Sequence, residues 1–200
     1  QSQQLLAFQF TGQGAQYTGM AKELYLEFEV YRNALNDCDQ IYRKLNGDTS
    51  LISVIFEEDS ENRIHQTKFT QPAIFCTAYA LTKLFESFGV RPDLVFGHSV
   101  GEFVAFCIAG MISLEDGIKL ICVRASLMQK LPEGGGMMSV LAPKSEVLNA
   151  IGRSQLPIAI AGINSPHQTV VSGLLDDLEK LKKQLQAEGF TCIPLTVSHA

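Results

Sequence analysis

The stretch PDLVFGHSVGEFVAFCIAG, residues 92–110, decides the fold. It begins with a short apolar run typical of a buried strand and continues with apolar residues at helical spacing. Between the two, Gly97, Ser99 and Gly101 form a GxSxG sequence. A GxSxG at a strand-to-helix turn is typical of a nucleophile elbow, which exposes the serine hydroxyl at the edge of a sheet. We therefore predict a strand over 92–98, a reactive Ser99 and a helix after it.

The start of this helix is a candidate binding place for negative charge. The first N–H groups of a helix have no helical acceptor, and the helix dipole favours an anion there. The Val100 N–H is therefore a candidate donor to an oxyanion formed at Ser99. A structural Gly-Ser turn without chemistry is the alternative, because a bare GxSxG is a weak signal.

A second glycine loop, GQGAQ at 12–16, follows the apolar run LLAFQF at 5–10. A loop at the carboxyl end of a parallel strand lies at the edge of the sheet where ligands of open α/β folds bind. The Gln13 N–H is thus a candidate second oxyanion donor. A phosphate loop would need GxGxxG, but Tyr17 stands where the third glycine belongs. A plain turn remains the other alternative.

Helical stretches alternate with these strands. The stretch 70–89 has Pro72 in the predicted first turn and Gly89 at its end, and the stretch 113–131 is a second helix. Strands that alternate with helices predict an α/β layer with a mainly parallel sheet.

The pattern changes at PEGGG, 132–136, which we interpret as a hinge. It separates a core over 1–131 from a second part over 137–198. In that second part the predicted elements follow the order β-α-β-β-α-β, which is the ferredoxin-like pattern.

Composition excludes several classes of function. A net charge of −5 argues against nucleic acid as a partner. No apolar run approaches the roughly 18 residues of a membrane span, and the N-terminus lacks the positive region of a signal peptide. We therefore expect a cytoplasmic protein with neither nucleic acid nor membrane as a partner.

Cysteines and histidines show no metal-binding spacing. Five cysteines without CxxC pairs fit a reducing compartment better than a disulfide framework. The four histidines lie far apart, and we expect no metal site: His65, His98, His167 and His199.

Arg124 stands in the apolar helical run KLICVRASLM. Such an arginine can lie on an exposed face, belong to a structural ion pair or bind a carboxylate with two hydrogen bonds. The residues alone leave these three interpretations open.

Taken together, the segments resemble one family over essentially the whole chain. They are FTGQGAQYTGMAKELY, FTQPAIF, GHSVGEFVAFCIAG, an arginine 25 residues after the serine, and NSPHQTVVSG. They are similar to malonyl-CoA:acyl-carrier-protein transacylases and to acyltransferase domains of polyketide and fatty acid synthases. The resemblance implies an α/β-hydrolase-like parallel-sheet core with an inserted ferredoxin-like subdomain, the C-terminal part of the core lying outside these 200 residues.

The resemblance assigns roles to individual residues. Ser99 matches the nucleophile that becomes the acyl ester, and Gln13 and Val100 match the two oxyanion donors. Arg124 matches the arginine that pairs with the free carboxylate of a malonyl-type acyl group. A planar fork of donors suits a carboxylate, so lysine would be a poor substitute.

Other matched positions have less defined roles. Gln71 and Asn164 match polar residues that line the cleft. His98 matches an elbow histidine that touches the acyl group or only packs. His65 and His167 look like ordinary surface histidines.

The family's general base is a histidine in a segment similar to HAFHS. The sequence ends Val197-Ser198-His199-Ala200, so His199 matches the first position of that segment. The base would lie two residues beyond Ala200. We therefore expect these 200 residues to lack the catalytic histidine and to be part of a larger protein. His199 is instead expected at the substrate-binding site, and with Val100 it favours malonyl over methylmalonyl.

The activity implied is ping-pong transfer of malonyl from malonyl-CoA through Ser99 to the phosphopantetheine thiol of an acyl carrier protein. Coenzyme A enters as the thioester substrate, and no metal or redox cofactor is expected. Other domains of a synthase are expected partners.

Two other classes of function remain open. A serine esterase or thioesterase requires an acid and a histidine after Ser99 in chain order. Asp116 stands at a predicted helix start, and Asp176 and Asp177 begin the amphipathic helix of the second part, so none is placed to orient a histidine. The third possibility is a non-catalytic interaction module.

Overall fold

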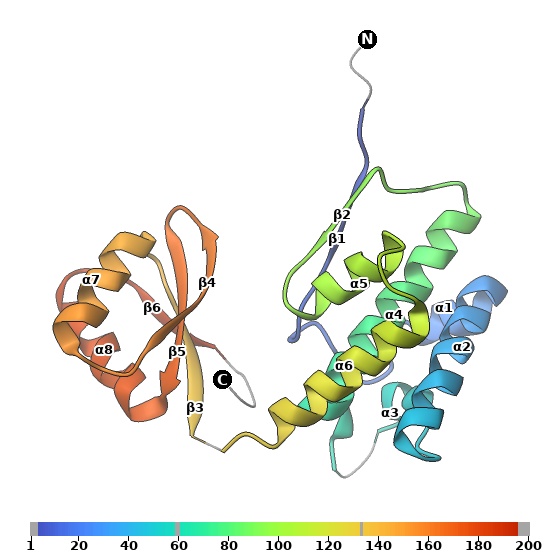
Figure 1. The fold of residues 1–200 in the computed structure, drawn as a ribbon, viewed down its shortest axis with the longest axis horizontal. Helices are drawn as coiled ribbons and strands as arrows, with labels where there is room; N and C mark the ends of the chain where they lie inside the picture. The colour runs from blue at the N-terminus through green and yellow to red at the C-terminus, as the bar shows by residue number, and fades with distance from the viewer. Residues whose placement is uncertain (1–3, 59–60, 133, 196–200) are drawn as a thin grey trace. The chain divides into compact units, whose positions relative to one another are not determined.

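The computed structural model describes residues 4–58, 61–132 and 134–195. The chain forms two compact units, one within residues 1–130 and one within residues 131–200 (Figure 1). Each unit has its own cluster of buried apolar side chains, as expected for parts that each bury a separate core.

The first unit contains a parallel pair of strands. Strand β1 (Ala7–Phe10) pairs with β2 (Leu94–Gly97), in a register that sets Ala7 opposite Leu94 and Phe10 opposite Gly97. The His98 N–H continues the pairing by donating to the Phe10 carbonyl at 3.1 Å. Because the strands are parallel, the loops that follow them leave the sheet at one edge. The predicted parallel pairing is therefore confirmed for these strands.

Helices form the rest of the first unit (Figure 1). In chain order the elements are α1 (Lys22–Glu27), α2 (Glu29–Asn46), α3 (Leu51–Phe56), the 3₁₀ turn η1 (Arg63–His65), α4 (Thr67–Ser87), α5 (Val100–Ile108) and α6 (Leu114–Gln129). Helix α4 lies at the centre and contacts α2, α5 and α6. Its fully buried Phe75 belongs to the core, together with Tyr31 of α2 and Ile118 of α6. Helix α4 is therefore held in place on several sides.

Helix α4 begins three residues earlier than predicted, at Thr67. The Gln66 carbonyl accepts from the N–H groups of Phe69 at 2.8 Å and Thr70 at 2.9 Å, which closes the first turn before the predicted start. Pro72 therefore lies in the second turn, and the prediction that placed it in the first turn is wrong. There it cannot donate to the carbonyl one turn earlier.

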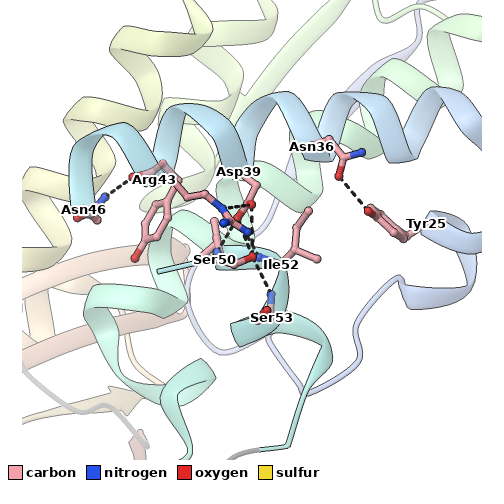
Figure 2. Close-up of polar contacts among 10 residues, drawn as sticks. Tyr25, Asn36, Asp39, Arg43, Asn46, Ser50, Ile52 and Ser53 are labelled. Atoms are coloured by element: carbon pink, nitrogen blue, oxygen red, sulfur yellow. Dashed lines mark hydrogen bonds and ion pairs between the residues drawn. The ribbon is translucent and has the colours of Figure 1, made fainter. Parts of the chain in front are cut away.

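A buried carboxylate joins α3 to the middle of α2 (Figure 2). Asp39 accepts hydrogen bonds from the N–H groups of Leu51 at 2.6 Å and Ile52 at 3.2 Å. It also accepts from Ser50 Oγ at 3.2 Å and from Arg43 Nε at 2.7 Å. The first N–H groups of α3 would otherwise have no acceptor, so Asp39 fixes where this short helix starts.

The second unit has the predicted order β-α-β-β-α-β. The elements are β3 (Gly135–Val140), α7 (Lys144–Ser154), β4 (Ala159–Ser165), β5 (Gln168–Leu174), α8 (Leu175–Ala187) and β6 (Cys192–Leu195). The strands form one antiparallel sheet in the order β4-β5-β3-β6, and both helices pack on it (Figure 1). The insertion of this unit into a larger hydrolase-like core stays a prediction.

The predicted hinge at 132–136 overlaps the sheet of the second unit. Strand β3 already begins at Gly135, where the backbone pairs with Leu174 of β5. Residue 133 lies outside the described residues. The last two glycines of PEGGG thus belong to strand β3, and the hinge prediction is wrong for them. A run of glycines is typical of a turn, so the sequence pattern did not indicate a strand there.

We expect Asp39→Ala to lower the free energy of unfolding by about 3 kcal/mol, because it leaves buried N–H donors of α3 without an acceptor. Chemical denaturation would measure the loss. The matched control is Asp37→Ala, at an exposed position two residues earlier in the same helix, which should change stability by less than about 0.5 kcal/mol. Equal effects of the two substitutions would show that the Asp39 contacts contribute nothing.

Candidate active site

Ser99 lies in the predicted position between β2 and α5, in a backbone conformation that few residues adopt. Its φ is 54° and its ψ is −113°. A non-glycine residue at positive φ is uncommon, and such conformations cluster at functional sites. The predicted order of strand, serine and helix is therefore present, with a sharp turn at the serine.

Two glycines allow this turn to pack against the sheet. A Cβ added at Gly97 would lie 2.0 Å from the Gly101 carbonyl carbon, and one at Gly101 would lie 2.2 Å from the Phe10 carbonyl oxygen. These atoms belong to the backbone and cannot move aside. Glycine is therefore required on both sides of Ser99, which explains the GxSxG spacing physically.

The GQGAQ loop lies against the elbow. A Cβ added at Gly12 would lie 2.9 Å from the His98 carbonyl oxygen and 3.3 Å from Ser99 Cβ. The next residue, Gln13, accepts a hydrogen bond from Thr67 Oγ1 at 2.8 Å through its side-chain Oε1. The two loops that the sequence placed at one edge of the sheet are thus adjacent.

Arg124 of α6 reaches the serine. Its Nη2 donates to Ser99 Oγ at 3.2 Å, its Nη1 donates to Gln71 Oε1, and its guanidinium lies 5.8 Å from the centre of the Phe103 ring. Partial burial lowers the pKa of Arg124. Among the described residues no carboxylate forms an ion pair with it. Of the three interpretations left open by the sequence, the structural ion pair thus has no support among the described residues.

Gln71 of α4 is fully buried and has both ends of its amide occupied. Its Oε1 accepts from Arg124, and its Nε2 lies 3.2 Å from Met128 Sδ. The amide therefore orients the guanidinium without neutralising its charge. Sequence periodicity could not reveal this pair, which joins residues 53 positions apart on two helices.

Three of the four histidines lie in the described residues, and all three are exposed. His98 is exposed at the elbow, with Nδ1 3.0 Å from where a Gly12 Cβ would stand. His65 is also exposed, yet its Nδ1 lies 3.4 Å from Gln16 Nε2 in the glycine loop, a contact that sequence reasoning missed. His167 is exposed in the second unit, and His199 lies outside the described residues.

Asn164 is exposed on β4 of the second unit. The structure describes the units separately, so its role at the cleft stays a prediction. In the first unit, Ser113 is the N-cap of α6: its Oγ accepts from the Asp116 N–H at 3.0 Å, and its hydroxyl donates to Asp116 Oδ2 at 2.7 Å. Asp116 therefore has a structural task, which weakens the esterase alternative.

The cysteines offer no competing nucleophile. All five are free, and burial raises the pKa of Cys76 and raises the pKa values of Cys107 and Cys122 to about 11. A thiol with a raised pKa is mostly protonated near neutral pH, and the thiol is a poor nucleophile compared with the thiolate. Ser99 is thus the better candidate for covalent chemistry.

Neither a metal cluster nor a membrane-spanning helix is found in residues 4–58, 61–132 and 134–195. No group of three or more His, Cys, Asp or Glu side chains there could hold a metal ion. No helix there combines the length and the apolar character needed to cross a membrane.

Comparison with known proteins identifies the family. Residues 7–200 match the family described as the acyl transferase domain. The chain belongs to this family. The resemblance of its motifs to acyltransferase domains of polyketide synthases is thereby confirmed.

Two curated relatives of this acyl transferase domain are much longer proteins. Polyketide synthase GfsA of Streptomyces halstedii is 37% identical over 203 residues, covering 98% of this chain and 3% of that protein. Mycoketide-CoA synthase of Mycobacterium tuberculosis is 39% identical over 194 residues, covering 96% of this chain and 4% of that protein. The chain thus spans a small fraction of the length of the relatives it matches.

Solved structures share the fold of this acyl transferase domain. The acyltransferase domain from the second module of the salinomycin polyketide synthase gives a TM-score of 0.92 at 40% identity, covering 100% of this chain and 46% of that one. Malonyl CoA-acyl carrier protein transacylase from Clostridium perfringens gives a TM-score of 0.87 at 36% identity, covering 98% of this chain and 62% of that one. Both solved structures therefore share the fold of this chain, whose family is shown by the match over residues 7–200.

We expect Gln71→Met to destabilise this acyl transferase domain by about 1–3 kcal/mol, because Arg124 Nη1 loses its acceptor in a partly buried place. Chemical denaturation measures the change. Gln129→Met is the matched control, since Gln129 accepts an exposed hydrogen bond from the Lys68 N–H at 3.3 Å. A loss no larger than in this control would contradict the orienting role of Gln71.

Proposed function

We propose that this acyl transferase domain moves a malonyl-type acyl group from coenzyme A through Ser99 to the phosphopantetheine thiol of an acyl carrier protein. The observation that carries the proposal is the contact of Arg124 Nη2 with Ser99 Oγ at 3.2 Å, made by a guanidinium without an acidic partner among the described residues. Its relatives support it, since they include polyketide synthases and a malonyl CoA-acyl carrier protein transacylase.

The charge of Arg124 suits an acyl group that ends in a carboxylate. The guanidinium is half-buried and oriented by the neutral amide of Gln71. A charge-assisted pair in such surroundings is stronger than one in open water, and the planar fork matches the two carboxylate oxygens. An acetyl group has no carboxylate and gains nothing from this arrangement. Arg124 is therefore proposed to select malonyl-type groups.

The reaction has two acyl transfers. Ser99 Oγ attacks the thioester carbonyl carbon, the C–S bond breaks, and coenzyme A leaves as a thiol. The thiol of the carrier protein then attacks the Ser99 ester, and the serine hydroxyl is restored. In both steps the carbonyl oxygen becomes negative, and the N–H groups of Gln13 and Val100 are proposed to stabilise it.

The serine proton needs an acceptor. Among the described residues, Ser99 Oγ contacts Arg124, and a guanidinium has no lone pair with which to accept a proton. The resemblance assigns the base to a histidine of the segment that His199 begins, two positions after Ala200. His199 itself is proposed to contribute, with Val100, to the choice of malonyl over methylmalonyl.

The proposed partners follow from the reaction. Malonyl-CoA is the donor, an acyl carrier protein is the acceptor, and further domains of a synthase are the setting in which both meet the enzyme. Neither transfer exchanges electrons, so the proposal requires no metal or redox cofactor.

We expect Arg124→Ala, in the intact protein, to lower the ratio of malonyl to acetyl loading on Ser99 by about 10- to 100-fold, the effect of losing a hydrogen-bonded charge. Mass spectrometry of the protein after brief incubation with malonyl-CoA or acetyl-CoA measures both adducts. Arg153→Ala is the matched control, because Arg153 pairs with Glu188 in the second unit and should leave the ratio unchanged.

Three outcomes would speak against this account. Equal losses of malonyl and acetyl loading in Arg124→Ala would remove the carboxylate-binding role. Absence of any Ser99 adduct in the unmodified protein, or hydrolysis without transfer to a carrier thiol, would refute the transferase function itself.

A further inference from the structure

We propose that Thr67 is a positioning residue of the active site. Its hydroxyl holds the Gln13 side chain, and through it the Gln13 N–H, where that N–H stabilises an oxyanion on Ser99. This inference rests on the proposed function and adds to it a residue that never touches the substrate.

The hydrogen bond between Thr67 and Gln13 is short, and its donor residue Thr67 is buried. Thr67 has no exposed surface, and its Oγ1 donates to Gln13 Oε1 at 2.8 Å across 54 positions of sequence. Thr67 is the first residue of α4, whose remaining length packs against α2, α5 and α6. The hydroxyl is therefore anchored to one of the best-packed elements of the first unit.

The glycine loop needs such an anchor. Gln13 is exposed and has glycine on both sides, and Gly14 has a φ of +116°. Glycine permits many backbone conformations, so the peptide groups of this loop depend on contacts to keep one orientation. The Gly14 N–H donates to Gln16 Oε1 at 2.8 Å, which holds the peptide group after Gln13 and not the one that carries the Gln13 N–H. An oxyanion donor works only when its N–H already points at the developing charge.

The loop is held on both sides of the Gln13 N–H. On one side, Gly12 packs so closely on the elbow that an added Cβ would lie 3.3 Å from Ser99 Cβ. On the other side, the Gln13 side chain is bound by Thr67. The peptide group between Gly12 and Gln13 carries the proposed donor, and these two contacts together restrict its rotation.

The first two turns of α4 serve two separate tasks. Thr67 and Gln71 are four residues apart, a spacing that places side chains on the same face of a helix. Gln71 orients Arg124, which matters for acyl groups with a carboxylate, whereas Thr67 orients a donor that every acyl group uses. The two residues should therefore differ in which substrates their loss affects.

The test compares Thr67→Val with the parent protein, intact, using malonyl-CoA and acetyl-CoA as substrates. Valine keeps the shape and removes the hydroxyl. We expect kcat to fall about 10- to 100-fold for both substrates alike, with KM nearly unchanged, because the misplaced donor acts on the transition state. Thr67→Ser restores the hydroxyl and should recover most of the rate.

Thr70→Val is the matched control. Thr70 is equally buried, in the same turn of α4, and its Oγ1 donates to the carbonyls of Ile64 at 2.6 Å and Gln66 at 3.0 Å. Thr70→Val should reduce the free energy of unfolding about as much as Thr67→Val does. It should leave kcat within about twofold of the parent value, since neither carbonyl belongs to the glycine loop.

Gln13→Leu removes the same hydrogen bond from the side of its acceptor. It keeps the backbone N–H and removes the acceptor at an exposed position, so it tests the contact even where Thr67→Val fails to fold. The double variant Thr67→Val with Gln13→Leu should be no slower than either single variant, because both substitutions break the same hydrogen bond between Thr67 and Gln13.

Several results would overturn the inference. They are additive losses in the double variant, a loss confined to malonyl-CoA, or an equal loss of kcat in Thr70→Val. Failure of the parent protein to form an adduct on Ser99 would instead refute the proposed function, and the two failures are thereby distinguished.

Discussion

The active site depends on a backbone contact between α5 and the end of β1. At Gly101 an added Cβ would lie 2.2 Å from the Phe10 carbonyl oxygen, and at Gly97 it would lie 2.0 Å from the Gly101 carbonyl carbon. Because no side chain fits at either position, the helix can begin directly at the edge of the sheet. Ser99 is then held at a φ of 54°, against the loop that contains Gly12. A larger residue at either glycine would separate the serine from that loop.

The charge of Arg124 is the second physical feature of the site. A partly buried guanidinium usually pairs with a carboxylate, which offsets the loss of hydration. Here Gln71 supplies a hydrogen bond without charge, so its amide leaves the positive charge of the guanidinium unneutralised. The Phe103 ring, whose centre lies 5.8 Å from the guanidinium carbon, is a second uncharged neighbour. The proposed binding of a carboxylate by Arg124 rests on this arrangement.

Helix α4 connects these features. Its first turn contacts the glycine loop through Thr67, and the following turn contacts Arg124 through Gln71. Its middle is packed in the core, with Phe75 fully buried. Rigid support of this kind lets a flexible glycine loop and a long arginine side chain keep fixed positions, which is what transition-state stabilisation requires.

The sequence by itself determined the local elements and their order. Glycine spacing around Ser99, apolar periodicity and turn residues are short-range signals, and they predicted the elbow, the parallel strands and the β-α-β-β-α-β order of the second unit. They failed at the start of α4, where Pro72 suggested a first turn that begins three residues later than the true one.

Only the tertiary structure decided what the side chains of distant elements contact. Arg124 had three interpretations until packing placed Gln71, and no described carboxylate, beside it. The bond from Thr67 to Gln13 spans 54 positions and leaves no trace in periodicity. Such pairs depend on the direction of individual side chains across packed helices and loops, and local sequence patterns carry no information about that direction.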